Sequence, residues 1–314
     1  SEMCIRDRDY YEDYPKGAAG IDHYRSLTYT FSGEIPVMIN PEFIYSCQMP
    51  TTDAPLVAAA PFKLGGWGGL NLVQDLIDAY QMVDGQDINE SSQDYPYPDA
   101  SVNFERIGGA NQTFSGFTLL ASTARMYNNR EPRFYAWVAF QNGYFECLTE
   151  KEKDAYAASF NAKRAGGKKW LTGFLKNENC GLYDDRTNNY SKTGYLNKKA
   201  VHPGQAAAES GKENNYEFPW PVIRLAELYL NYAEACVGYD KEGYPAKGMP
   251  YLDLVRKRAG LPAVKDSWAN AKHPFSDYSD GKGGPNGQLT NIVRQERMIE
   301  LYPVSYTHLR AHET

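Results

Sequence analysis

Three stretches of this 314-residue chain hold residues whose types could do chemistry, and two of them have the wrong spacing for it. "GKGGPNG" at 281–287 is glycine-rich and holds a lysine, but it lacks the GK[ST] ending of a P-loop and follows no predicted strand. "DGQDINE" at 84–90 places a carboxylate at every third position, whereas a calcium loop needs ligands at alternate positions and a glutamate at its twelfth. We interpret both as solvated loop or helix-end sequence.

Local signatures of catalysis are also missing from the sequence. It contains no GxSxG nucleophile motif, no HExxH and no paired histidines for zinc, so neither a metal nor another cofactor is predicted. Cys47, Cys147, Cys180 and Cys236 show no CxxC spacing, and their redox state stays open. Carboxylates are plentiful, so the acid and base of a glycosidase remain an alternative, although nothing singles out a pair.

The third stretch, "LGGWGGLN" at 64–71, gives the sharpest candidate for binding, Trp67. Two glycines on each side offer the indole no local cover, so it is either a plug folded back onto the body or an exposed stacking platform. Aromatic faces bind apolar sugar faces with little loss of side-chain entropy. Among the other tryptophans, Trp137 is expected in the core and Trp220 as a packing staple, while Trp170 and Trp268 are left undecided.

The two chain ends encode each other on opposite DNA strands. Ser1–Asp7 can be written TCG GAG ATG TGT ATA AGA GAC, and its reverse complement translates as VSYTHLR, which is Val304–Arg310. An inverted repeat of adapter DNA around an insert gives this result, whereas selection on protein ends does not. We therefore expect residues 1–8 and 303–314 to be adapter-derived, extended and unpacked, and residues 9–302 to be a fragment cut at both ends.

Composition excludes some classes of protein. The net charge of −6 argues against a nucleic-acid binder, which needs a basic stripe, and no apolar run is long enough to span a bilayer. The 25 tyrosines and 5 tryptophans suit a wet, adhesive surface, or equally a loop-rich domain with half-buried aromatic residues.

The elements that would position Trp67 differ between the two parts of the chain. Residues 9–218 predict a loop-rich lobe with a helix at 70–82, which ends at Asp84-Gly85, and a strand pair around the turn in "EPRFYAWVAFQNGYFEC" (131–147). The stretch 166–218 is expected to form long surface loops with short strands.

Residues 219–302 predict a helical hairpin and a third helix. The first helix is expected at 219–239, ending near Gly238, with Leu225, Leu228, Tyr229 and Tyr232 on its inner stripe and three alanines, Ala226, Ala233 and Ala235, allowing close approach. Its antiparallel partner begins with Pro250 near N1, turns Leu252 and Val255 inward, and stops at Gly260 and Pro262. The third helix, 288–302, has Thr290 as a possible cap and an inner face of Leu289, Ile292, Val293, Glu296 and Ile299. Because this helix is cut, Ile292, Val293 and Ile299 are expected to lack part of their cover.

Several motifs, taken in order, resemble the SusD/RagB-like outer-membrane nutrient-binding lipoproteins. They are "NPEFIYSC" (40–47), "LIDAYQMVDG" (76–85), "YNNREPRF" (127–134), "TGYLNKKAVHP" (193–203), "PVIRLAELYLNYAEA" (221–235), "YLDLVRKRAGLP" (251–262) and "RQERMIELY" (294–302). Structural roles suit these motifs better than binding roles. Arg224, Glu227 and Glu234 are placed for helix-to-helix ion pairs, and Arg130 and Arg133 for fixing a turn.

The resemblance implies a mainly α fold, in which tetratricopeptide-like helical hairpins carry a large irregular lobe. It also implies a non-catalytic, surface-exposed outer-membrane lipoprotein that captures a glycan and passes it to a TonB-dependent SusC-like transporter. The lipid anchor would lie in the missing N-terminal part. By the same resemblance, ligand-stacking aromatics are expected in the loop of Trp67 and in the segment before it, which makes Tyr45 a second candidate.

Three alternatives stay open at this point. Some relatives handle peptides, the abundant acids leave room for a carbohydrate-active enzyme, and the helical part alone suits a protein-binding repeat scaffold. The scaffold hypothesis predicts that aromatic substitutions in the Trp67 loop leave function untouched.

Overall fold

The computed structural model of the chain describes residues 23–33, 35–49, 58–62, 66–91, 105–114, 117–146, 169–185, 187–199, 201, 218–239, 243–274 and 288–302. The expectations for the two chain ends, for 281–287 and for Cys147 lie outside these residues.

Helices dominate the described residues, and the strands are short. The helices are α1 (His23–Ser32), α3 (Gln74–Ala79), α5 (Pro132–Trp137), α7 (Leu225–Gly238), α8 (Tyr244–Arg258), α9 (Val264–Ala269) and α10 (Gln288–Leu301), with 3-10 turns η2 (Val37–Ile39) and η4 (Arg125–Tyr127). The strands pair antiparallel in twos: β1 (Phe43–Met49) with β8 (Phe218–Arg224), β2 (Gln112–Phe114) with β3 (Phe117–Leu119), β4 (Val138–Ala139) with β7 (Leu196–Asn197), and β5 (Tyr144–Glu146) with β6 (Lys169–Leu171).

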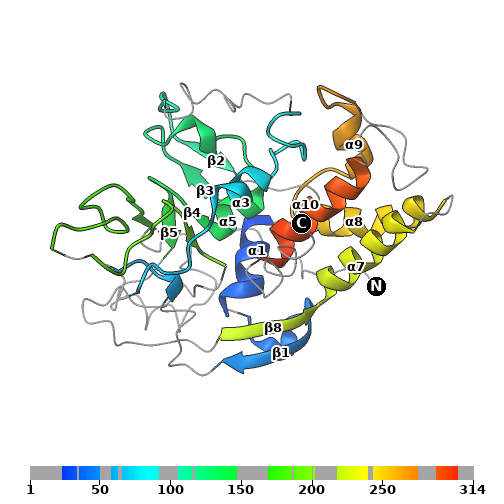
Figure 1. Ribbon diagram of the computed structural model, residues 1–314, viewed down its shortest axis with the longest axis horizontal. Helices are drawn as coiled ribbons and strands as arrows, with labels where there is room; N and C mark the ends of the chain where they lie inside the picture. The colour runs from blue at the N-terminus through cyan, green and yellow to red at the C-terminus, as the bar shows by residue number, and fades with distance from the viewer. Residues whose placement is uncertain are drawn as a thin grey trace.

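Figure 1 shows the two parts of the molecule side by side. Helices α7 to α10 gather on one side, strands β2 to β5 lie on the other, and the β1–β8 ribbon runs along the lower edge. Helices α1, α3 and α5 lie between them. This helix-dominated arrangement with an irregular lobe confirms the predicted fold class.

An aromatic core fills the lobe around α5. Trp137, which is fully buried as expected, meets Phe31 of α1 edge-on with ring centroids 5.5 Å apart. Phe117 of β3 stacks on Tyr135 of α5 at 5.0 Å. Buried aromatic pairs of this geometry add to the free energy gained from burial alone.

The strand pair expected within residues 131–147 is wrong. Residues 132–137 form α5, because Pro132 sits at its first turn, where a missing N–H costs nothing. A turn does follow, with the N–H of Gly143 donating to the carbonyl of Phe140 at 2.9 Å. The strands on either side of it pair elsewhere: β4 with β7 and β5 with β6.

The expected helix at 219–239 begins six residues late. Residues 218–224 form β8 and pair with β1, because prolines at 219 and 221 remove backbone donors and bias the residue before each of them toward extended conformations. Trp220 therefore lies on a strand and not at the start of a helix. Its side chain is partly buried and packs against the lobe core.

The inner face expected for α7 is wrong for Leu228 and Tyr232, whereas Tyr229 packs against the core as expected. The buried side chains of α7 are Ala226, Glu227, Leu230, Ala233, Cys236 and Val237, whereas Leu228 and Tyr232 are nearly half exposed. The close packing of α7 on its neighbours is made through small and aliphatic side chains, such as those of Ala226, Leu230 and Ala233, and not through Leu228 and Tyr232. Ala226 and Ala233 are buried as expected, and Ala235 is exposed.

Helices α7 and α8 form the expected antiparallel hairpin. Tyr239 contacts Tyr244 near the turn, and Tyr232 contacts Tyr251 further along, each with ring centroids 4.7 Å apart. Between these pairs, Gly248 lies so close to α7 that a Cβ would stand 2.9 Å from that of Cys236. Helix α8 starts earlier than expected, however: Pro245 lies in its first turn, and Pro250 lies inside the helix.

The C-terminal end of α8 agrees with the prediction, whereas α3 differs from it. Helix α8 ends at Arg258 and Gly260 has a φ of 79°, as the stop signal predicted, while Leu252 and Val255 are buried. Helix α3 is shorter than expected and ends at Ala79. In α9, Trp268 belongs to the core of the helical part, which answers the question left open for it.

Helix α10 has the predicted inner face. Leu289, Ile292, Val293, Glu296 and Ile299 are all buried. The expectation that Ile292, Val293 and Ile299 lack cover is wrong, because α7 and the two apolar clusters enclose them. Thr290 lies inside the helix, not at its cap.

Candidate functional site

Trp67 lies on a loop that backbone hydrogen bonds hold in place. The N–H groups of Gly66, Gly68 and Gly69 donate to the carbonyls of Pro61, Ala60 and Ala58 at 3.0, 2.9 and 2.7 Å. These donors fold the glycine-rich segment back onto residues 58–61. The indole itself is 49% exposed, which favours the platform over the plug. The loop is thus ordered by its main chain while its single large side chain stays accessible.

Two of the four glycines around Trp67 are needed for close approach. A Cβ on Gly66 would stand 2.0 Å from the carbonyl oxygen of Ala60, and one on Gly68 would stand 3.3 Å from the carbonyl carbon of Tyr190. Gly68 also has a φ of 57°, in the left-handed region that favours glycine. From the sequence alone, these glycines were expected only to leave Trp67 uncovered.

Tyr45 lies on β1, opposite Ile223 of β8, and is 61% exposed. The ribbon and η2 also carry other exposed apolar side chains: Met38, Ile39, Ile44, Val222 and Ile223. Among the described aromatic residues, no ring contact joins Tyr45 to Trp67. The structure therefore places the two sequence-predicted candidates on different elements, without direct contact.

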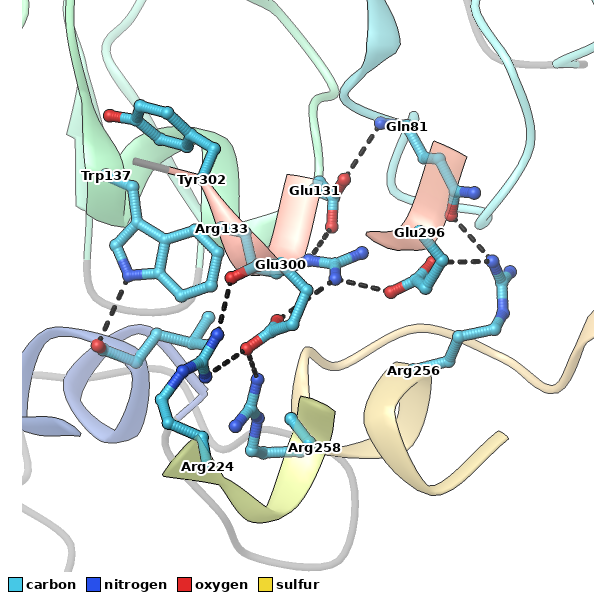
Figure 2. Close-up of polar contacts among 12 residues, drawn as sticks. Gln81, Glu131, Arg133, Trp137, Arg224, Arg256, Arg258, Glu296, Glu300 and Tyr302 are labelled. Atoms are coloured by element: carbon cyan, nitrogen blue, oxygen red, sulfur yellow. Dashed lines mark hydrogen bonds and ion pairs between the residues drawn. The ribbon is translucent and has the colours of Figure 1, made fainter. Parts of the chain in front are cut away.

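A buried network of charged side chains joins the lobe to the helices (Figure 2). At one end, Glu300 of α10 accepts from Arg258 and, at 2.8 Å, from Arg224, which precedes α7. Glu42 forms ion pairs with the same two arginines, at 2.8 Å with Arg258 and 3.2 Å with Arg224, and accepts a hydrogen bond from Arg224. The role predicted for Arg224 is confirmed, since it joins the start of α7 to α10.

At the other end of the network, Arg133 of α5 joins the lobe to α10. Its guanidinium contacts Glu131 at 2.6 Å, Glu296, and Glu300 at 3.4 Å, and all four side chains are fully buried. Arg133 thus reaches well beyond the local turn predicted for it. Arg130 does fix a turn, because it donates to the carbonyls of Ile77 and Tyr80 at the end of α3.

Burial and the neighbouring charges together shift the pKa values of Glu300 and Lys199. Burial alone would raise the pKa of Glu300, but Arg258, Arg224, Lys199 and Arg133 outweigh burial and hold it well below its usual range. Burial lowers the pKa of Lys199 well below the usual value for lysine, and Arg224 adds to this effect. Lys199 donates to the carbonyls of Glu300 and Tyr302 at 2.6 and 2.5 Å, at the end of α10.

The described residues offer no ready metal centre. They contain no group of three or more His, Cys, Asp or Glu side chains placed to hold an ion. Cys47, Cys180 and Cys236 take part in no disulfide, and burial raises the pKa of Cys180 to about 12. None of the described helices is long and apolar enough to cross a membrane.

Sequence reasoning missed most of the network. Glu234 was expected to pair between helices and does so with Arg297 of α10 at 2.8 Å. Glu42, Lys199 and Gln81 were given no role, although all three stand in quoted motifs. A charged residue at a fixed place in an apolar motif was the available signal, but its partner lies far away along the chain, 182 residues for Glu42 and Arg224.

The chain belongs to the SusD family, whose pattern matches residues 37–303. A SusD-like protein of Bacteroides ovatus is 34% identical over 74 residues, which cover 23% of this chain and 14% of that protein. Two solved structures share the fold at low identity. A SusD-like protein of Bacteroides fragilis is 21% identical with a TM-score of 0.58, over 89% of this chain and 44% of the other. The protein called BT4246 is 20% identical with a TM-score of 0.62, over 92% and 43%. The chain therefore spans less than half the length of these relatives.

Proposed function

We propose that this chain is the glycan-capturing part of a non-catalytic surface protein, and that Trp67 is the stacking platform for the sugar. One observation carries the proposal: in a member of the SusD family, a half-exposed indole stands on a loop whose backbone is hydrogen-bonded in place. A platform of this kind loses little entropy when it binds a sugar face. Tyr45, more exposed but on the β1–β8 ribbon, is a secondary candidate.

The acids of the buried network are not candidates for the acid and base of a hydrolase. Glu131, Glu296 and Glu300 are fully buried and each is bonded to arginine, so none faces a space where a sugar could enter. An acid and base for glycoside hydrolysis must flank the scissile bond. We expect purified protein to release no reducing sugar from any glycan that it binds.

Affinity electrophoresis and calorimetry against starch, xylan, pectin and galactomannan, with oligopeptides alongside, test the platform. Trp67→Ala is expected to weaken glycan binding by about 1–3 kcal/mol, the usual loss for one aromatic anchor. Tyr239→Ala is the matched control, since Tyr239 is a similarly exposed aromatic residue on the α7–α8 hairpin and is 54% exposed. Binding to oligopeptides alone would move the proposal to a peptide ligand. Equal affinity in Trp67→Ala and wild type would remove Trp67 from the site.

Delivery to a TonB-dependent SusC-like transporter and anchoring by an N-terminal lipid belong to the same proposal, supported by family membership alone. Co-purification of the full-length protein with its neighbouring transporter tests delivery. Partition into a detergent phase before and after removal of the N-terminal cysteine tests the anchor. Failure of either leaves glycan capture standing.

A further inference from the structure

The side chain of Asn71 joins the Trp67 loop to a second loop that follows Tyr190. Its amide Nδ2 donates to the carbonyls of Gly68 and Gly69 at 3.3 and 3.0 Å. Its Oδ1 accepts from the hydroxyl of Ser191 at 2.6 Å and from the N–H of Lys192 at 3.0 Å. Two donors and two acceptor positions are all that an asparagine side chain has, so Asn71 is fully used in holding the two loops together.

The second loop is itself anchored on both sides. The N–H of Ser191 donates to the carbonyl of Cys180 at 3.0 Å, and the N–H of Asn197 donates to the carbonyl of Leu70 at 3.0 Å. Gly68 packs against the backbone of Tyr190, at a distance where even a methyl group would press on it. The position of Trp67 relative to residues 190–192 is therefore fixed by the backbone and by one amide.

Residues 190–192 carry groups suited to a polar, flat ligand. The ring of Tyr190 is partly exposed, and the exposed ammonium of Lys192 lies 4.9 Å from its centroid. In the part of the chain that the structure describes, no carboxylate pairs with this ammonium. A lysine has three donors and no acceptor, so Lys192 can donate to the acceptor oxygens of a sugar bound beside the indole.

We propose that Trp67 and the Tyr190–Lys192 turn form one carbohydrate-binding surface, with Trp67 and Lys192 touching the ligand and Asn71 as the positioning residue between them. This inference rests on the proposed glycan function and names the second contact of that site. The neutral amide at 71 and the cation at 192 then act in different ways: the first sets the geometry of the surface, and the second adds a contact.

Asn71→Asp tests the positioning role because it breaks only half of the clamp. A carboxylate still accepts from Ser191 and Lys192, but it cannot donate to the carbonyls of Gly68 and Gly69 and repels them instead. Loss of two hydrogen bonds is expected to weaken glycan binding about 5- to 30-fold. Asn177→Asp is the matched control, because Asn177 clamps a different exposed loop, donating to Asp184 at 2.9 Å and accepting its N–H at 3.1 Å.

A readout that needs no ligand separates this inference from the proposed function. Protein labelled with 5-fluorotryptophan gives one fluorine resonance for each tryptophan, and Trp67→Phe identifies that of Trp67. Asn71→Asp is expected to shift or broaden the Trp67 resonance and to leave those of the buried Trp137 and Trp268 in place, while Asn177→Asp changes none of the three. An unmoved Trp67 resonance in Asn71→Asp overturns the positioning role.

Lys192→Ala tests the second contact, since its backbone N–H to Asn71 is kept. We expect it to weaken binding of the best glycan in the panel about 3- to 10-fold without moving the Trp67 resonance. If Trp67→Ala loses binding while Asn71→Asp and Lys192→Ala bind as wild type, the shared surface is disproved and the proposed function stands. If wild type binds no glycan, the proposed function fails and the fluorine resonances alone decide the role of Asn71.

Discussion

The Trp67 loop and the buried charge network are held by opposite means. The loop lies at the surface, is tied down by neutral backbone hydrogen bonds, and presents one large side chain to solvent. The network lies out of solvent, is built from charged side chains, and joins α5, α7, α8 and α10 (Figure 2). A change in the loop should therefore alter binding and spare the fold, whereas a change in the network should do the reverse.

The largest effect is expected from Arg133→Met. Removing this guanidinium leaves the buried Glu131 and Glu296 without a main partner, and breaking a buried pair in this way costs about 3–5 kcal/mol of stability. Urea unfolding followed by circular dichroism measures it. Glycan affinity of the folded fraction should match wild type. A decrease of less than about 1 kcal/mol in the free energy of unfolding would mean that the ion pairs of Arg133 contribute no more than surface ion pairs do.

A smaller, pH-dependent effect is expected from Glu300→Gln. The carboxyl takes up a proton near pH 4.5 in the unfolded chain but only at lower pH in the folded protein, because its folded pKa is depressed. Its contribution to stability is then complete above about pH 5 and declines as the pH falls below that value. The stability gap between wild type and Glu300→Gln should shrink by about 1–2 kcal/mol between pH 5 and pH 3. A gap that stays constant over this range would contradict the depressed pKa.

Gly68→Ala is the corresponding change in the Trp67 loop. A residue with a side chain costs about 1–2 kcal/mol in the left-handed conformation that Gly68 adopts, and the new methyl group presses on Tyr190. We expect weaker glycan binding, with the unfolding transition shifted by no more than that amount. Gly109→Ala is the control, because Gly109 also has a positive φ of 66° but faces open space. Equal affinities in the two variants would show that the contact with Tyr190 has no part in binding.

The smallest effect is expected from Glu234→Gln. This carboxylate pairs with Arg297 at 2.8 Å between α7 and α10, but it is partly exposed to solvent. Surface pairs contribute about 0–1 kcal/mol, so unfolding should shift by less than that and should be sensitive to salt. A loss comparable to that of Arg133→Met would mean that burial does not separate the two kinds of ion pair.

The sequence predicted what depends on neighbouring residues. Three features could be predicted because each depends only on nearby residues. They are the apolar period of α10, the glycine that ends α7, and the glycine and proline that follow α8. The alternating aromatic residues at 134–140 were misjudged, since the same residues bury equally well on a short helix whose first turn is set by Pro132. The start of α7 was misplaced because the pairing of β8 depends on β1, more than 170 residues earlier in the chain.

The candidate site was predictable in part and for a similar reason. The four glycines around Trp67 predicted an uncovered indole, and in the structure the indole is half exposed. Nothing in the sequence indicated that Asn71 would meet Ser191 and Lys192, because that contact forms only when β7 and its preceding turn return to the end of the Trp67 loop. Whether Trp67 and Tyr45 bind ligand stays a prediction.

The two prolines of β8 have a consequence for how this molecule behaves at high concentration. A proline in a strand lacks the N–H that a further strand would need, and it is tolerated where that missing donor faces outward. The β1–β8 ribbon carries exposed Ile44, Val222 and Ile223, the kind of apolar strand surface on which chains stack edge to edge. Prolines 219 and 221 remove two of the backbone donors that a further strand pairing with β8 would use, so they should lower the tendency of this ribbon to aggregate.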